Sequence, residues 1–177
     1  MTPILHTERL KIYPVTDDHL PHLVAGLNYW SVARNLSPIP FPYAIEDALS
    51  YFPAQQRRRM ETDSHCWIIF DAGFCGLVAV DFEGRIGELG YWLRPDCWGK
   101  GYATEAARAA VGFAFAGPRC DKLVAGHAED NPASGRVLTK LGFVEIKRGE
   151  HYYVSRQMMV SRIGLELTRE RWQAFRS

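Results

Sequence analysis

The stretch that decides the fold runs from residue 93 to residue 106 and reads Leu93-Arg94-Pro95-Asp96-Cys97-Trp98-Gly99-Lys100-Gly101-Tyr102-Ala103-Thr104-Glu105-Ala106. It starts at the end of a predicted strand, turns at its two glycines and enters a predicted helix. Glycine lets the backbone turn sharply and lets a ligand approach without a side chain in between. The first turn of a helix leaves N–H groups unpaired at its positive end. Together these features predict a site for phosphate or pyrophosphate.

Two common phosphate motifs do not fit this stretch. The P-loop requires G-x-x-x-x-G-K-S/T, but no such glycine span precedes Lys100, and Gly101 follows it. The dinucleotide motif G-x-G-x-x-G is matched at Gly99 and Gly101, but Thr104 stands in its third glycine place. The alternative without a ligand is a tight turn that caps a helix.

Outward from this stretch, hydrophobic periodicity predicts one domain, residues 1–177, in which strands and helices are mixed. Strands are predicted over 9–15, 66–70, 74–82, 85–93, 122–127 and 143–147, with further strand material in 152–168. Helices are predicted after a cap at 16–18 and over 46–60, 103–114, 132–141 and 169–175. The short connections 71–73 and 83–84 are typical of antiparallel hairpins. The predicted fold class is therefore α/β in the α+β sense: a mixed, mostly antiparallel twisted sheet flanked by helices.

Composition and charge set outer bounds on the kind of protein. With 21 basic and 20 acidic side chains the net charge is +1, which argues against a chain built mainly to bind nucleic acid or an anionic membrane. No signal peptide is expected at the N-terminus, and no apolar stretch approaches the roughly 20 residues that span a bilayer. The four cysteines form no C-x-x-C pair and favour a reducing compartment, so we expect a cytoplasmic protein. His19 and His22, three residues apart on a predicted helix, are interpreted as surface histidines, so no metal site is predicted.

The loop at residues 98–103 resembles the acetyl-CoA pyrophosphate loop of the GCN5-related N-acetyltransferases (GNAT). In that loop a Gln or Arg is followed three residues later by Gly and five later by Gly or Ala. Gly101 and Ala103 match; Trp98 replaces the Gln or Arg, as is familiar in the branch that acetylates the N-termini of ribosomal proteins. A second block, residues 130–143, resembles the family's N-x-x-S-x-x-V/L-L-x-K-x-G-F helix. The opening Thr7-Glu8-Arg9-Leu10 and the proline-rich loop at 36–42 also resemble that branch.

This resemblance implies the GNAT fold and an acyltransferase that moves an acetyl group from acetyl-CoA to a primary amine by direct attack. The acceptor would be a peptide or protein N-terminus or a small-molecule amine. The residues that the resemblance assigns to acetyl-CoA binding are Tyr91, Trp92, Leu93, Trp98, Gly99, Lys100, Gly101, Tyr102, Ala103, Thr104 and Asn131.

Two of these assignments have a structural basis of their own. In the family the strand here spanning 87–93 splays from its neighbour, so that the backbone of residues 91–93 pairs with the pantetheine arm like an added strand. Gly87 and Gly90 inside that strand indicate a bulge or a close backbone approach. Asn131 is also predicted as a plain helix N-cap, with Pro132 at the first helical position.

Acetyl transfer needs a neutral amine, a donor to the oxyanion and a proton for the departing thiolate. Amines with a pKa of about 8 or about 10.4 are largely protonated at neutral pH, so a general base helps. Glu88 is the first candidate base, because pleating places it on one strand face with Gly90 and an acid on an apolar strand is costly unless used or paired. Its alternative role is a salt bridge or an exposed edge carboxylate. His127 is the second candidate, with a structural role as its alternative.

Ser134 is the candidate acid for the thiolate, because the resemblance places its hydroxyl near the coenzyme sulfur. Tyr152, Tyr153 and water are the alternatives, and the candidate oxyanion donor is a backbone N–H near Tyr91 or Leu93. The sequence leaves these choices open.

Several questions of function stay open at this point. The acceptor is a peptide N-terminus, a polyamine, an antibiotic amine or a small metabolite. The acceptor side of the site is lined by Tyr29, Trp30 and residues 38–43, or else these residues only cover the hydrophobic face of the sheet. Homodimers are common in the related branch, which leaves a homodimer open for this chain. The alternative functions are a catalytically silent CoA-binding or protein-interaction module of the same fold, and a nucleotide-binding module.

Overall fold

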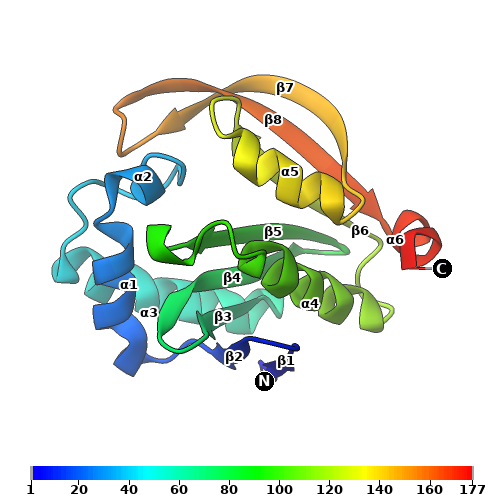
Figure 1. Ribbon diagram of the computed structural model, residues 1–177, viewed down its shortest axis with the longest axis horizontal. Coiled ribbons are helices and arrows are strands. Elements are labelled where there is room, and N and C mark those ends of the chain that lie inside the picture. Colours follow the sequence, from blue (N-terminus) through cyan, green and yellow to red (C-terminus); the bar gives the residue numbers. More distant parts are fainter. Residues whose placement is uncertain (1, 177) are drawn as a thin grey trace.

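The computed structural model describes residues 2–176, which form one mixed sheet with helices on both faces (Figure 1). The strand order across the sheet is β1-β2-β3-β4-β5-β6-β8-β7. The pair β5–β6 is parallel, whereas every other neighbouring pair is antiparallel. The strands are β1 Leu5–His6, β2 Lys11–Pro14, β3 His65–Phe70, β4 Phe74–Glu83, β5 Ile86–Leu93, β6 Lys122–Ala128, β7 Val144–Tyr153 and β8 Met158–Thr168.

The helices are divided between the two faces of the sheet. They are α1 Leu20–Leu27, α2 Trp30–Ala33, α3 Ile45–Thr62, α4 Tyr102–Ala116, α5 Pro132–Lys140 and α6 Arg169–Arg176, with short 3-10 turns at Asp17–His19 and Pro95–Cys97. One core packs α4, α5 and α6 on the sheet face that carries Val78 and Leu123. The other packs α1, α2 and α3 on the face that carries Ile68 and Ala79. Successive strand residues therefore alternate between two separate cores.

The strands β5 and β6 are paired only over the first part of their length and then diverge. The opening between them is where the candidate site lies. Their register covers only Ile86–Glu88 of β5, opposite Lys122–Val124 of β6. Beyond Glu88 the strand β5 stays paired with β4 up to Leu93, while β6 follows β8. Figure 1 shows α5 and the β7–β8 hairpin arching away from β5 toward α2. The predicted splay of this strand is thus present in the structure.

The structure corrects some sequence-based expectations about the elements. The sequence pattern misses β1 and α2, which have two and four residues. The strand predicted over 143–147 continues to Tyr153. Gly87 and Gly90 are expected to mark a bulge or a close backbone approach; the bulge is absent, because the β4–β5 register is continuous there. A β-carbon on Gly87 would lie 2.6 Å from Leu123 Cδ2, so close packing explains that glycine.

Candidate active site

The parted strands border a cavity of about 970 Å³ that is lined by β5, β6, α4, α5 and the segment following α2. Twelve of the thirteen predicted site residues line it: Glu88, Tyr91, Trp92, Leu93, Trp98, Gly99, Gly101, Tyr102, Ala103, Thr104, Asn131 and Ser134. The thirteenth, Lys100, turns aside, and its ammonium lies 5.7 Å from the centre of the Tyr102 ring. Twelve of the thirteen residues predicted from the sequence therefore line the same cavity.

At one end of the cavity the loop before α4 has the backbone shape that an anion site requires. Gly99 and Gly101 have φ angles of +74° and +81°, in the left-handed region that favours glycine. A β-carbon on Gly99 would meet nothing within 4 Å, so the loop surface is open on that side. Gly101 is the N-cap of α4, whose first-turn N–H groups carry partial positive charge. This geometry fits a bound pyrophosphate.

The middle of the cavity is bordered by the free edge of β5. The Leu93 carbonyl lies on that edge, because it accepts a 2.8 Å hydrogen bond from the indole Nε1 of Trp98. Alternate residues of an antiparallel strand direct their peptide groups to the same edge, so Tyr91 presents its backbone there as well. A β-carbon on Gly90 would meet nothing within 4 Å, so this part of the strand also borders open space. An extended amide-containing chain fits here as an added strand.

The first turn of α5 faces this edge and carries two predicted residues. The Asn131 Oδ1 accepts from the backbone N of Ser134 at 3.4 Å, so Asn131 is the predicted N-cap, and Pro132 occupies the first helical position. The Tyr91 hydroxyl donates to the Ser134 carbonyl at 3.1 Å and lies 2.9 Å from the Ser134 Oγ. Because the phenol has one proton, the Ser134 hydroxyl donates to the Tyr91 oxygen. The two hydroxyls thus form a pair that spans from β5 to α5.

The Tyr91 side chain was not singled out from the sequence, which assigned this residue a backbone role. Burial raises the pKa of Tyr91 to about 12, and the hydrogen bond with Ser134 only partly offsets this. The phenol therefore stays protonated at physiological pH. A partly buried aromatic residue on a core-facing strand position gives no sequence signal of this kind, because it cannot be distinguished from a residue that only packs against the core.

Charged side chains gather at the other end of the cavity. Glu88 accepts from the guanidinium of Arg162 at 3.3 Å, and its side chain is 60% exposed. Asp81 is directly opposite Glu88 in the β4–β5 register. Arg162 reaches Glu88 from β8 across β6, and it can do so because Gly126 has no side chain: a β-carbon there would lie 2.5 Å from Arg162 Cζ. The alternative predicted for Glu88, a salt bridge, is thus present, and the carboxylate still faces the cavity.

The alternative acid–base residues are placed differently from one another. The His127 Nδ1 lies 2.8 Å from the Ala128 carbonyl, which can only accept, so Nδ1 carries the proton and Nε2 is left as an acceptor. His127 is buried, and its Nε2 lies against Gly135 of α5, where a β-carbon would be 2.8 Å away. Tyr153 is buried and lines the cavity. Tyr152 is 51% exposed and is not among the lining residues.

Asp81 and Arg162 are functional-site residues that were not predicted from the sequence. Asp81 interrupts the apolar run Phe74–Phe82, the same signal that singled out Glu88 on the next strand. Arg162 and Gly126 come together only through the β6–β8 register. That pairing could not be read from the sequence.

Comparison with known proteins identifies the family. Residues 9–144 match the family model described as the acetyltransferase (GNAT) domain. The chain belongs to the GNAT family. It is therefore an acetyl-CoA-dependent N-acetyltransferase, as the loop and the α5 block predicted. A GNAT relative, the uncharacterized N-acetyltransferase YoaA of Bacillus subtilis (strain 168), is 29% identical over 149 residues, which cover 81% of this chain and 84% of that protein.

Solved GNAT structures share the whole fold at low sequence identity. The ribosomal-protein-S5-alanine acetyltransferase from Vibrio fischeri superposes with a TM-score of 0.81 at 16% identity, covering 96% of this chain and 98% of that one. The spermidine N-acetyltransferase from Vibrio cholerae, solved with CoA and spermine, gives 0.79 at 16% identity, covering 94% and 99%. These likenesses confirm the predicted fold class.

Residues 2–176 contain neither a cluster of metal-ligating side chains nor a helix suited to cross a membrane. These residues contain no group of three or more His, Cys, Asp and Glu side chains arranged to hold a metal ion. Within the same range no helix is long and apolar enough to cross a membrane.

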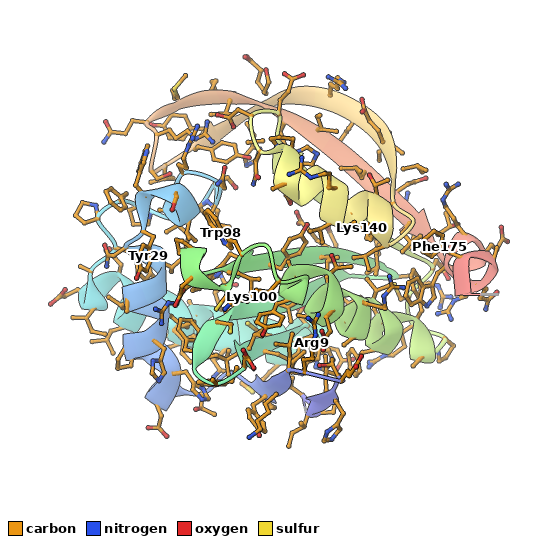
Figure 2. All side chains as sticks on the ribbon, in the orientation of Figure 1. Arg9, Tyr29, Trp98, Lys100, Lys140 and Phe175 are labelled. Atoms are coloured by element: carbon orange, nitrogen blue, oxygen red, sulfur yellow. The ribbon has the colours of Figure 1, made fainter. Side chains whose placement is uncertain are left out.

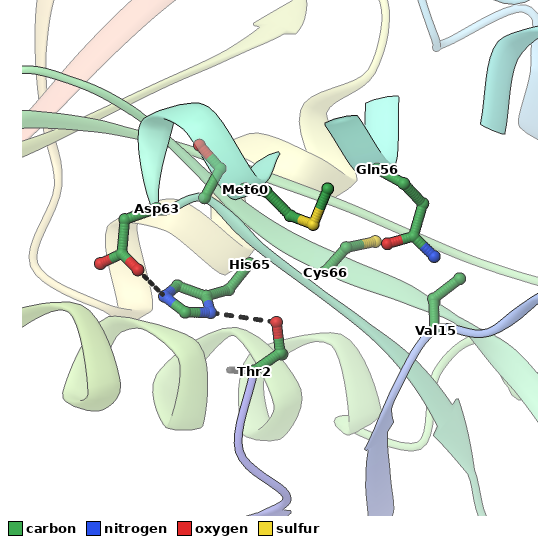
Figure 3. A pocket seen from close by; sticks show the side chains of 8 residues that line it. Thr2, Val15, Gln56, Met60, Asp63, His65 and Cys66 are labelled. Atoms are coloured by element: carbon green, nitrogen blue, oxygen red, sulfur yellow. Dashed lines mark hydrogen bonds and ion pairs between the residues drawn. The ribbon is translucent and has the colours of Figure 1, made fainter. Parts of the chain in front are cut away.

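A second, smaller cavity of about 320 Å³ lies between the N-terminal segment, α3 and β3 (Figure 3). The buried His65 borders it, with Nδ1 at 3.1 Å from the Thr2 hydroxyl and Nε2 at 3.8 Å from Asp63. Trp67 fixes the same segment by donating to the Pro3 carbonyl at 2.6 Å. None of the thirteen predicted site residues lines this cavity.

Proposed function

We propose that this GNAT enzyme acetylates a primary amine, of a peptide N-terminus or of a small molecule, by direct attack on acetyl-CoA. The observation that carries the proposal is the continuity of the large cavity. It runs from the glycine loop of α4, along the free edge of β5, to the Glu88–Arg162 pair. A thioester held along the first two features would meet an amine at the third.

The residues of this chain would then divide the work between them. The first-turn N–H groups of α4 and the loop glycines would hold the pyrophosphate, and the β5 edge would hold the pantetheine amides. Acetyl-CoA supplies an activated acyl group on a thiol leaving group. Glu88 would take the proton of the amine, because its carboxylate is exposed in the cavity, whereas His127 lines the same cavity but is buried against Gly135 of α5. Ser134 would return a proton to the thiolate by turning its hydroxyl from the Tyr91 oxygen toward the sulfur, and its oxygen would regain a proton from solvent.

Two features of the acceptor end favour a cationic amine. Asp81 and Glu88 face one another across β4 and β5, while Arg162 is a single opposing charge beside them. The named structural neighbours act on amines of two kinds, a ribosomal-protein alanine and spermidine, so both classes belong in the acceptor search. The four free, buried thiols fit the reducing conditions of a cytoplasmic enzyme.

The decisive experiment combines ligand stabilisation with an acceptor screen. Acetyl-CoA at about 100 times its dissociation constant should raise the free energy of unfolding by roughly 2.7 kcal/mol, while ATP and NAD should not. Thiol release is then followed with peptides bearing free N-termini, their N-acetylated counterparts as controls, and polyamines. Stabilisation by acetyl-CoA without thiol release for any amine would favour a catalytically silent CoA-binding module. Stabilisation by ATP or NAD alone would contradict the proposal.

A further inference from the structure

Arg9 is tied to the glycine loop by contacts that the proposed chemistry does not use. The Thr7 hydroxyl accepts from the Leu10 N–H at 3.0 Å and donates to the Leu10 carbonyl at 3.1 Å, which closes a tight turn that displays Arg9. From this turn Arg9 reaches the start of α4, almost a hundred residues later in the chain. Figure 2 shows Arg9 and Lys100 close together beside the beginning of that helix.

The contacts of Arg9 use both its backbone and its guanidinium. Its backbone N–H donates to Glu105 Oε1 at 2.9 Å, and its Nε donates to Glu105 Oε2 at 2.7 Å. Its Nη2 lies 2.6 Å from the same Oε2. Its Nη1 donates to the Lys100 carbonyl at 2.9 Å. The guanidinium also lies over the Tyr102 ring, 5.0 Å from its centre.

The bond to the Lys100 carbonyl fixes the peptide group that joins Lys100 to Gly101. In a trans peptide the C=O and the N–H point in opposite directions. Because the carbonyl points at Arg9, the Gly101 N–H points away from Arg9. Gly101 lines the cavity, and because a glycine backbone can adopt many φ values besides the +81° seen here, a contact from outside the loop is needed to hold this peptide in one orientation.

The positive charge of Arg9 is largely neutralised by Glu105, whose side chain is only 16% exposed. Burial alone would raise the pKa of Glu105, but its other interactions, above all the hydrogen bonds from Arg9, outweigh burial and hold the pKa below its ordinary value. Glu105 therefore stays ionised and bound to Arg9. A second restraint acts on the same loop, because the Tyr102 hydroxyl donates to Asp71 at 2.7 Å.

We propose that Arg9 is a positioning residue, which orients the Lys100–Gly101 peptide toward the pyrophosphate of acetyl-CoA through geometry rather than through its charge. This inference rests on the proposed function of the cavity. It assigns a role to the Thr7–Leu10 motif that the chemistry of acetyl transfer leaves unexplained. It also predicts that the effect depends on the pyrophosphate being present in the acetyl donor.

The test compares two acetyl donors in steady-state turnover. S-acetylpantetheine carries the thioester and the pantetheine arm but lacks the pyrophosphate. Arg9→Ala should raise KM for acetyl-CoA about tenfold, the effect of one lost well-placed hydrogen bond near charge, with kcat within about twofold. Turnover of S-acetylpantetheine should be unchanged. Calorimetric titration with CoA should show the same loss of affinity and needs no acceptor.

Two further variants separate geometry from charge. Arg9→Lys keeps the charge but cannot bridge Glu105 and the Lys100 carbonyl with one compact ammonium, so it should not restore KM. Glu105→Gln removes the negative charge beside the loop. If Arg9 acted by its charge, Glu105→Gln would tighten CoA binding; under our proposal it weakens it. The control is Arg85→Ala, which breaks an exposed ion pair with Asp121 whose two members do not line the cavity.

Two outcomes would overturn the inference, and a third would overturn only the proposed function. Equal losses with both donors would mean that Arg9 supports the fold in general. No loss with acetyl-CoA would mean that the loop holds its shape without Arg9. If the wild-type protein bound acetyl-CoA and acetylated no amine, the proposed function would fail while the positioning role could still be measured by CoA titration.

Discussion

Gly101 serves both the conformation of the loop and the approach of the pyrophosphate, and the two contributions can be measured separately. Its φ of +81° strains any other residue, and a β-carbon would lie 3.3 Å from Arg9 Nη2. Gly101→Val should therefore lower acetyl-CoA affinity by blocking the pyrophosphate and should cost about 1–2 kcal/mol of stability. Calorimetric titration and urea unfolding measure the two effects.

The matched control for this variant is Gly84→Val in the β4–β5 turn. Gly84 has a φ of +59°, and a β-carbon there meets nothing within 4 Å. The control should lose similar stability and keep its affinity for acetyl-CoA. Unchanged affinity in Gly101→Val would remove the loop from the binding site.

Glu88 is the residue on which the proposed base chemistry depends. Glu88→Gln keeps the shape of the side chain and an acceptor for Arg162 but cannot take a proton. We expect acetyl-CoA affinity to hold and turnover at pH 7 to fall by about 10²–10⁴-fold, the usual contribution of a general base. The loss should shrink at high pH, where more of the amine is already neutral. Glu83→Gln, at the exposed end of β4, is the control; near-normal turnover in Glu88→Gln would move the role to His127 or to water.

At the scale of elements, the sequence predicts those that bury an apolar face and misses those held by pairing alone. The helix α4 and the hairpin strands β3, β4 and β5 follow clear apolar periods. By contrast, β7 is exposed along most of its length. The middle of this strand is charged and has no hydrophobic face, so its place in the sheet depends on pairing with β8. The register shifts lie between Ile69 and Phe70 and between Glu145 and Lys147, opposite Gly76 and Gly164 rather than at Gly87 or Gly90.

The end of the β7–β8 hairpin is joined to α2 and to the start of α5 through Asp130. Its carboxylate accepts from Arg34 at 2.6 Å and from Arg156 at 2.8 and 3.0 Å. The Arg156 side chain is only 9% exposed, whereas Asp130 is 46% exposed. Asp130→Ala should therefore lower stability by about 1–2 kcal/mol, less than the loss of a fully buried pair.

The stability of Asp130→Ala is measured by urea unfolding, with Glu129→Ala, at the neighbouring residue, as the control. Glu129 pairs with Arg148 on an exposed surface, with side chains 53% and 58% exposed. The control should change stability by less than about 0.5 kcal/mol. Equal effects in the two variants would contradict a joining role for Asp130.

For the whole molecule, the acetyl-CoA half of the cavity is predictable and the acceptor half is not. The glycine loop and the α5 block are each a continuous stretch of sequence, so the role of each can be predicted from its residue types. The acceptor end is assembled from residues such as Asp81, Glu88 and Arg162 on three strands, and only the sheet register brings them together. Arg9 and Glu105 likewise meet only in the folded chain.

The pH dependence of stability is a property of the whole molecule, and His65 gives it a defined slope. Burial lowers the pKa of His65 below its ordinary value of 6.5, and the ring packs edge-on to Phe113 at 4.6 Å. Below about pH 6.5 the unfolded chain therefore binds the proton more readily than the folded chain. Stability should fall as pH drops from about 6.5 toward the folded pKa, by up to about 1.4 kcal/mol per pH unit for this one proton.

The neighbouring carboxylate of Asp63 would have the opposite effect on the pH dependence of stability, so the two effects can be distinguished experimentally. Asp63 lies 3.8 Å from Nε2 and would favour the protonated ring, but Arg119 is ion-paired with that carboxylate. Urea unfolding between pH 5 and 7.5 should show the slope in the wild type and a flatter profile in His65→Gln. His19→Gln is the control, because burial also lowers the pKa of His19 but that side chain is only half-buried. Stability that rises as pH falls through this window would mean that the Asp63 charge, rather than burial, governs His65.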